Sequence, residues 1–317
     1  MDFTTQLLIA AISAGTPLLL ATLGGILNER AGIIQLGAEG LMLMGAVTTF
    51  IVYIRSGNLL LALLAAIAVT AVLGLVHAFL CVTLRANQTM SGLAMTLFGS
   101  GLSAYLGKSI SGIPLPGTSP KLDLGWVKGI PVIGDIFGRM DGLTWFSLLL
   151  VLVLHLLIHR TSWGLHLRAV GDSPATADVM GIRVQLIRYS YITAGTALIG
   201  LAGADMVLAY APTWNEGLTA GRGWIAVGLV IFARWNPLPA LFCAYFFGAL
   251  DLLGFRIQVL RRFSPPRRKP DAVDLAGLLI LPPAAAGNAA AHDAFDVNTL
   301  RFADDHDTVS ERLPVLH

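Results

Sequence analysis

Residues 56–84 read SGNLLLALLAAIAVTAVLGLVHAFLCVTL and contain no aspartate, glutamate, lysine or arginine. A helix needs about 20 mostly apolar residues to cross the hydrocarbon core of a membrane. The run is therefore long enough to span a bilayer. It predicts that this part of the chain is surrounded by lipid and not by water.

Similar apolar runs lie on both sides of this stretch. Hydrophobic residues make up 55% of the 317 residues and charged residues only 13%, whereas a soluble domain carries roughly 25% charged residues. The sequence therefore predicts an all-α, polytopic transmembrane helix bundle with about eight membrane segments. These are expected at residues 3–27, 40–54, 56–84, 86–107, 142–158, 189–210 and 238–255, with a run at 223–233 that is short for a full crossing.

The loops between these runs predict the orientation of the chain. Residues 159–188 carry four arginines against two aspartates, whereas residues 108–141 are nearly balanced and rich in proline and glycine. Basic loops stay on the cytoplasmic side of a membrane. We therefore expect 159–188 inside, 108–141 outside and the N-terminus outside. The first run lacks a basic region before it, so we expect it to be retained as a span and not cleaved as a signal.

The first candidate functional segment, residues 27–40, reads LNERAGIIQLGAEG. Asn28, Glu29, Gln35 and Glu39 stand between two apolar runs. Polar groups at membrane depth need a partner or a water-filled cavity, so these four residues are predicted to line a translocation path. The alternative is an ordinary cytoplasmic turn with its charges in water, although Glu39 lies against the apolar run that follows.

The second segment, residues 171–182, reads GDSPATADVMGI and has the pattern of a short capped helix. Asp172 or Ser173 suits the N-cap, Pro174 the first helical position and Gly181 the residue after the end. We expect Ala175 and Ala177 to be exposed on a two-turn helix that stands alone. Such a helix is unstable in water unless it docks on something. It is predicted to enter a groove of a partner, or else to pack on its own chain.

The third segment, 221–237, has a short apolar run flanked by glycine, tryptophan and proline. Short segments of this kind often mark broken helices near a transport path. The alternative is that Arg234 and Trp235 are plain interfacial anchors. The chain has no GxxxxGK[ST] phosphate loop, so we expect no ATP hydrolysis by the chain itself. No catalytic, cofactor or metal residues are predicted.

Three stretches carry a resemblance to a known family. The resemblance is to permeases of ABC importers for nucleosides and simple sugars. It is carried by residues 27–46 (LNERAGIIQLGAEGLMLMGA), 163–182 (WGLHLRAVGDSPATADVMGI) and 221–248, the last of which contains GRGWIAVGLVIFARWNPL. These permeases are distant relatives of the branched-chain amino-acid permeases. The resemblance covers about residues 5–255, and the length is similar to that of the shorter of the two permease types in such systems.

The resemblance implies a type II importer-like fold and several partners. They are a second permease subunit, two ABC ATPase subunits and an external substrate-binding lipoprotein, in the inner membrane of a prokaryote. ATP binding would close the ATPases and move the coupling helices, so that the cavity opens outward. The coupling role falls on residues 172–181, and Asn28, Glu29, Gln35 and Glu39 match the opening motif of the family. No nucleic-acid partner is implied.

The chain departs from the family pattern after Phe255. Residues 1–255 form the predicted permease domain, and 256–317 are predicted to be a disordered, proline-rich and charged tail. A family member continues with one or two more spans, so a frame-shifted or replaced C-terminus and a natural tail are both open.

Other functions remain as alternatives. A branched-chain amino-acid permease would share the fold and mechanism. An ion-coupled carrier would need buried carboxylates, for which Glu39 and Asp205 are the candidates. A membrane-embedded enzyme would need a metal or nucleophile cluster that the sequence does not show.

Overall fold

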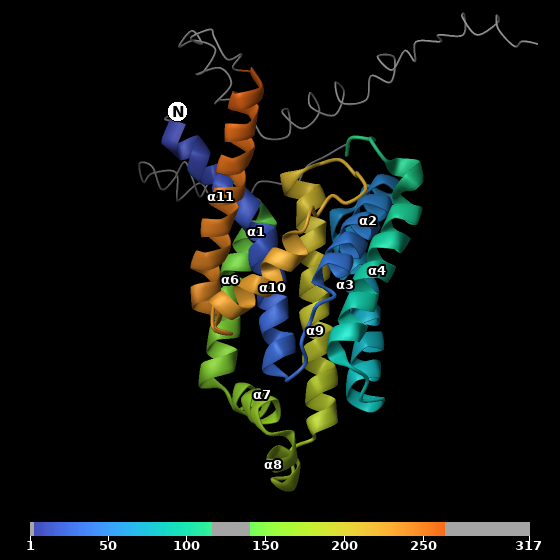
Figure 1. Cartoon of the computed structure of the whole chain (residues 1–317), viewed down its shortest axis with the longest axis vertical. Coiled ribbons are helices and arrows are strands. Elements are labelled where there is room, and N and C mark those ends of the chain that lie inside the picture. Colours follow the sequence, from blue (N-terminus) through green and yellow to red (C-terminus); the bar gives the residue numbers. More distant parts are fainter. Residues whose placement is uncertain (1–2, 116–139, 264–317) are drawn as a thin grey trace, which may run out of the picture. The chain divides into compact units, whose positions relative to one another are not determined.

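The computed structural model describes residues 3–115 and 140–263, and within these ranges the chain is a helical bundle (Figure 1). The helices are α1 (Phe3–Arg30), α2 (Ala38–Ser56), α3 (Leu59–Ala78), η1 (Phe79–Thr83), α4 (Gln88–Gly107), η2 (Lys108–Ile110), α6 (Gly142–Arg160), α7 (Ser162–Asp172), α8 (Pro174–Val179), α9 (Val184–Asp205), η3 (Met206–Tyr210), α10 (Arg222–Phe232) and α11 (Pro237–Phe263).

Local signals fix several helix boundaries. The side chains of Asn58 and Asn87 accept hydrogen bonds from the third residue beyond them and so cap α3 and α4. Thr161 caps α7 in the same way. Side-chain oxygens are favoured here because the first amides of a helix have no partner within it. Gly57 ends α2 in a left-handed conformation, which glycine adopts without steric cost.

Helix α9 lies in the interior and packs against α1, α2 and α3, while α1 also packs along α11. Glycines make these approaches close. A Cβ added at Gly45 of α2 would collide with the backbone of Gly200 on α9, and one added at Gly248 of α11 would meet the backbone of Gly15 on α1. Small residues let helix backbones come together in lipid, where no hydrophobic force drives association.

In the part of the chain that the structure describes, six helices are long and apolar enough to cross a membrane. They contain α1, α2, α3, α6, α9 and α11. Helix α4 and the short α10 complete the segments expected from the sequence, so the predicted polytopic all-α bundle is confirmed. The predicted spans lie on these helices, with ends shifted by a few residues.

Two predicted regions lie largely outside the described residues. Of the predicted outer loop, residues 116–139 lie outside them. Helix α11 continues past Phe255 to Phe263, so the start of the predicted tail is helical, and residues 264–317 lie outside the described part of the chain.

The connection from α9 to α10 meets the end of α4 at the predicted outer face. Leu115 N donates to the carbonyl of Pro212 (2.8 Å) and Gly112 N to that of Trp214 (3.1 Å). The indole of Trp214 is 1% exposed and packs against Gly107 at the end of α4. These contacts hold the connection against the bundle before the chain enters α10.

Candidate functional site

The connection between α1 and α2 is a non-helical segment, residues 31–37, that runs back along the bundle. In Figure 1 it rises from the lower end of α1 to the beginning of α2. Helix α1 itself continues through Arg30, so Asn28 and Glu29 lie on its last turn and not in a free turn. Helix α2 therefore does not begin at the end of the bundle where α1 ends.

Side chains of neighbouring helices satisfy the backbone of this segment. Gln88 of α4 accepts from Ile34 N (3.0 Å), and Thr96 of α4 donates to the carbonyl of Leu36 (2.9 Å). Arg188 of α9 donates to the carbonyl of Ala31 (3.2 Å). Irregular backbone is tolerated at membrane depth only where protein or a cavity surrounds it. No local pattern in the sequence links these three residues to the segment, so their contacts were not predicted.

Asn28 and Gln35 are buried, with 0% and 1% of their surface exposed. The Asn28 amide, oriented to satisfy its nitrogen, donates to the carbonyls of Tyr191 (3.2 Å) and Ile192 (3.0 Å) on α9. Asn28 therefore ties α1 to α9. Neither polar atom of the Gln35 side chain has a partner in the described part of the chain.

Glu39, in the first turn of α2, joins the beginnings of two helices. Its Oε1 accepts from the hydroxyl of Thr219 (2.5 Å) and from Gly221 N (2.9 Å), and its Oε2 accepts from Gly223 N (2.7 Å). Gly221 is the N-cap of α10 and has a φ of 86°. Glu39 thus occupies the place of a capping side chain for α10. We call the meeting point of the α2 and α10 N-termini the helix junction.

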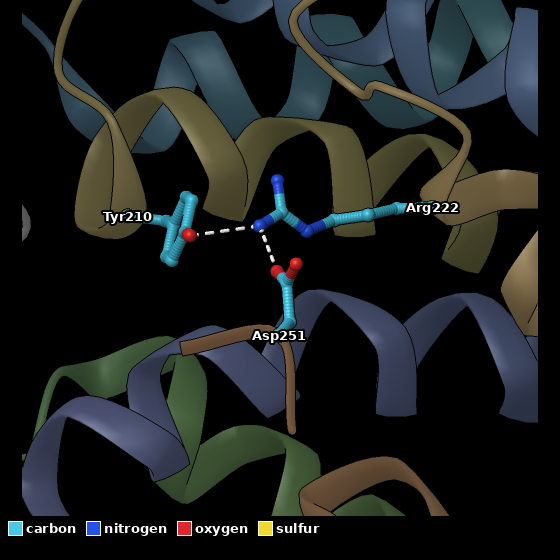
Figure 2. A network of polar contacts seen from close by, with 3 residues as sticks. All are labelled: Tyr210, Arg222 and Asp251. Carbon is cyan, nitrogen blue, oxygen red and sulfur yellow. Dashed lines mark hydrogen bonds and ion pairs between the residues drawn. The ribbon is translucent and has the colours of Figure 1, made fainter. Parts of the chain in front are cut away.

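Arg222, the first residue of α10, is 6% exposed and lies beside the helix junction. Figure 2 shows its guanidinium between Tyr210 and Asp251. One nitrogen donates to the Tyr210 hydroxyl (2.7 Å) and forms an ion pair with Asp251 of α11. The guanidinium carbon also lies 4.3 Å from the centre of the Tyr210 ring, within the range of a cation–π interaction. Sequence reasoning missed this network, since its members are 12 and 29 residues apart.

Glu29 does not reach the helix junction but holds the turn between α10 and α11. Its carboxylate accepts from the Trp235 indole (2.5 Å), and Arg30 donates to the Trp235 carbonyl (3.0 Å). Arg234 and Trp235 both have positive φ, at 53° and 54°, a conformation that costs L-residues energy. Trp235 is thus more than an interfacial anchor.

Asp205, named above as a candidate buried carboxylate, lies at the end of α9 and is buried, with 1% of its surface exposed. Neither carboxylate oxygen has a hydrogen-bond partner in the described part of the chain.

The predicted short helix is present as α8, which Pro174 begins and after which Gly181 has a φ of 80°. Asp172 is the last residue of α7, and Ser173 holds the N-cap position with its hydroxyl bonded to that of Thr176 (2.8 Å). However, α8 does not stand alone, because it packs on α7 and α9.

The expected exposure of Ala177 is wrong, although Ala175 is exposed. Ala177 is 3% exposed because it faces the protein's own helices, whereas Val179 and Met180 are 87% and 76% exposed. Figure 1 shows α7 and α8 at the end of the bundle where α1 ends. Val179 and Met180 are two consecutive apolar residues at the tip of an element predicted to be cytoplasmic. This pattern in the sequence indicates a contact surface, and the prediction did not use it.

The apolar helices define a multi-pass membrane protein, and at the helix junction the N-termini of two of its helices meet. Comparison with known proteins gives the class. The family described as "Branched-chain amino acid transport system / permease component" matches residues 7–280, and the chain belongs to it. It is a membrane permease of the prokaryotic plasma membrane and not an enzyme.

Three curated relatives make the comparison finer. The chain is 41% identical to the "Putative glucose ABC transporter permease protein TsgC13" of Haloferax volcanii, over 88% of this chain and 84% of the relative. It is 34% identical to the "Guanosine ABC transporter permease protein NupQ" of Bacillus subtilis, over 80% and 83%. It is 29% identical to the "Nucleoside ABC transporter permease protein NupC" of Lactococcus lactis, over 79% and 82%. No solved structure matches the chain.

Proposed function

We propose that this chain is the translocation subunit of an ABC importer for a simple sugar or a nucleoside. The observation that carries the proposal is the helix junction, where polar groups of α2 and α10 meet inside the bundle. The printed names of the relatives, a glucose permease and two nucleoside permeases, support the substrate class over a branched-chain amino acid. They also favour an ATP-driven importer over an ion-coupled carrier.

The partners follow from the same reasoning. A second permease subunit would complete the pathway, two ABC ATPases would supply the energy, and an external lipoprotein would deliver the substrate. The family match makes the chain one component of a transport system.

The α7–α8 pair would receive the force from the ATPase. Val179 and Met180 present an apolar tip next to the exposed Asp178, and Ala177 fixes the helix to α7 and α9. Exposed apolar side chains rimmed by polar ones are typical of a protein contact. We infer that Val179 and Met180 enter a groove on the ATPase, and that residues 172–181 act as a unit with α7.

The translocation path would pass the helix junction. Of the four polar residues predicted there, Glu39 lies at the junction and Gln35 on the segment that leads to it. Asn28 and Glu29 would instead stabilise the helices around the path. Asn28 bonds to α9, and Glu29 bonds to the turn before α11.

Uptake measurements test the substrate class. Cells that express the chain together with the transport genes adjoining its own are expected to accumulate labelled glucose or guanosine, and to lose uptake when the ATPase is inactivated. Leucine is the control solute. Uptake of leucine without the sugar or the nucleoside would contradict the proposal.

Cross-linking tests the contact with the ATPase. A cysteine in place of Val179 is expected to form a cross-link to the ATPase subunit in membranes that hold the complex. A cysteine in place of Lys108, which is exposed at the predicted outer end, is the matched control and should form none. Equal cross-linking at both positions, or none at Val179, would exclude α8 as the contact.

A further inference from the structure

The beginning of a helix inside a membrane protein is a place that attracts anions. The first backbone amides of a helix have no partner within it, and the aligned peptide dipoles place about half a positive charge there. Transporters with broken helices use such N-termini to bind anionic groups of their substrates. The helix junction brings two N-termini together, those of α2 and α10.

In this chain the amides at the junction are already bonded to a carboxylate. Glu39 accepts from the N–H groups of Gly221 and Gly223 and from the Thr219 hydroxyl. Gly223 also lies against the backbone of Glu39 itself, so the two helix ends are in direct contact. A carboxylate from outside would meet both an occupied set of donors and a negative charge.

The cation beside the junction is neutralised independently. Arg222 belongs to α10, is 6% exposed, and forms its ion pair with Asp251 of α11. Without Asp251, a buried guanidinium next to a helix N-terminus would be a strong anion site, since arginine binds carboxylate and phosphate well. Two carboxylates thus neutralise two sources of positive potential. Glu39 of α2 neutralises the N-terminus of α10, and Asp251 of α11 neutralises the Arg222 guanidinium.

We propose that Glu39 and Asp251 are specificity-determining residues that neutralise the helix junction and make the importer reject anionic solutes in favour of uncharged polar ones. This inference rests on the proposed function, because it assumes that solute passes the junction. It predicts that a sugar is carried but its uronic acid is not, and that a nucleoside is carried but its monophosphate is not.

The first experiment measures anion binding without transport. Replacing Glu39 by alanine removes the equivalent of an acetate ion, and replacing Asp251 by alanine removes the equivalent of formate. We expect acetate to raise the thermal unfolding temperature of purified Glu39→Ala, and formate that of Asp251→Ala, by about 3 °C. Acetamide and formamide, the neutral counterparts, are the controls at equal ionic strength. Wild type and Glu216→Ala, which removes an exposed carboxylate of the 211–221 connection, should respond to neither anion.

The second experiment measures competition in the assembled transporter. Glu39→Gln and Asp251→Asn keep the side-chain shapes and remain useful if the alanine variants fail to fold. In these variants the concentration of uronic acid or nucleoside monophosphate that halves uptake should fall about tenfold, the factor expected for one additional charged hydrogen bond. Wild-type uptake of the neutral solute should resist these competitors.

The outcomes separate the two proposals. If wild type carries neither sugar nor nucleoside, the proposed function fails, and the anion titration still decides whether Glu39 and Asp251 fill an anion site. Unfolding temperatures that respond equally to acetate and acetamide in every variant would overturn the inference. So would equal inhibition of wild type and variants by the anionic competitors.

Discussion

The helix junction and the α7–α8 pair each interrupt the regular pattern of membrane helices, but they differ in what they leave unpaired. At the junction, Glu39 and Asp251 satisfy amides, a hydroxyl and a guanidinium within the same chain. At α8, the buried Ala177 secures the helix, whereas Val179 and Met180 remain exposed. Substitutions in the first region are therefore expected to change mainly the stability and the proposed selectivity of this chain, and those at the tip of the second its proposed contact with a partner.

The largest effect is expected at Arg222. Arg222→Met leaves Asp251 and the Tyr210 hydroxyl without their shared donor. Breaking a fully buried ion pair costs about 3–5 kcal/mol; because the Asp251 side chain is 32% exposed and water can solvate it, the expected cost lies at the lower end, about 3 kcal/mol. Thermal unfolding of the purified chain measures this loss. Arg160→Met, at an exposed arginine at the end of α6, is the control and should change little. Equal behaviour of the two variants would show that the junction does not depend on its ion pair.

A smaller loss is expected at Ala177. Ala177→Glu places a charge against α7 and α9, but α8 can detach locally, so the expected cost is about 1–3 kcal/mol. Proteolytic cleavage within residues 173–182 should become clearly faster, whereas the unfolding temperature of the whole chain should fall only slightly. The same substitution at the exposed Ala175 is the matched control, and equal sensitivity at both positions would contradict the packing of Ala177.

The next largest loss of stability is expected at the turn between α10 and α11. Trp235→Phe removes the indole N–H that donates to Glu29, and the loss of a hydrogen bond to a charged group in a partly exposed position is expected to cost about 1–2 kcal/mol. Trp163→Phe, at a residue of α7 that is 72% exposed, provides the comparison in the same unfolding assay. A larger loss at Trp163 than at Trp235 would argue against the role of this turn.

The smallest effect on stability is expected at the tip of α8. The double variant Val179→Ser, Met180→Ser should unfold within about 0.5 kcal/mol of wild type, because exposed side chains contribute little to the folded state. Uptake by the complete transporter should nevertheless fall strongly, because the proposed contact with the ATPase would be lost. Normal uptake by this variant would contradict the proposed contact of Val179 and Met180 with a partner.

The fold could be predicted largely because membrane helices leave a local signal. An apolar run of spanning length, such as 56–84, identifies a helix without knowledge of its neighbours. Pro174 and Gly181 likewise bound α8 through conformational preferences of single residues. The failure at Ala177, which was predicted to be exposed and is buried, concerns which neighbour a residue faces.

Runs of consecutive residues are enough to predict that this chain crosses a membrane, where its helices lie and which short segments interrupt them. They also single out Glu39 as a charge beside an apolar run. The hydrogen bonds of Glu39 to Gly221 and Gly223 and the ion pair of Arg222 with Asp251 depend instead on how the helices pack. The partners of a buried polar group are set by helix packing, which joins residues on different helices, 29 positions apart for Arg222 and Asp251 and 182 for Glu39 and Gly221, and leaves no periodic pattern in the sequence.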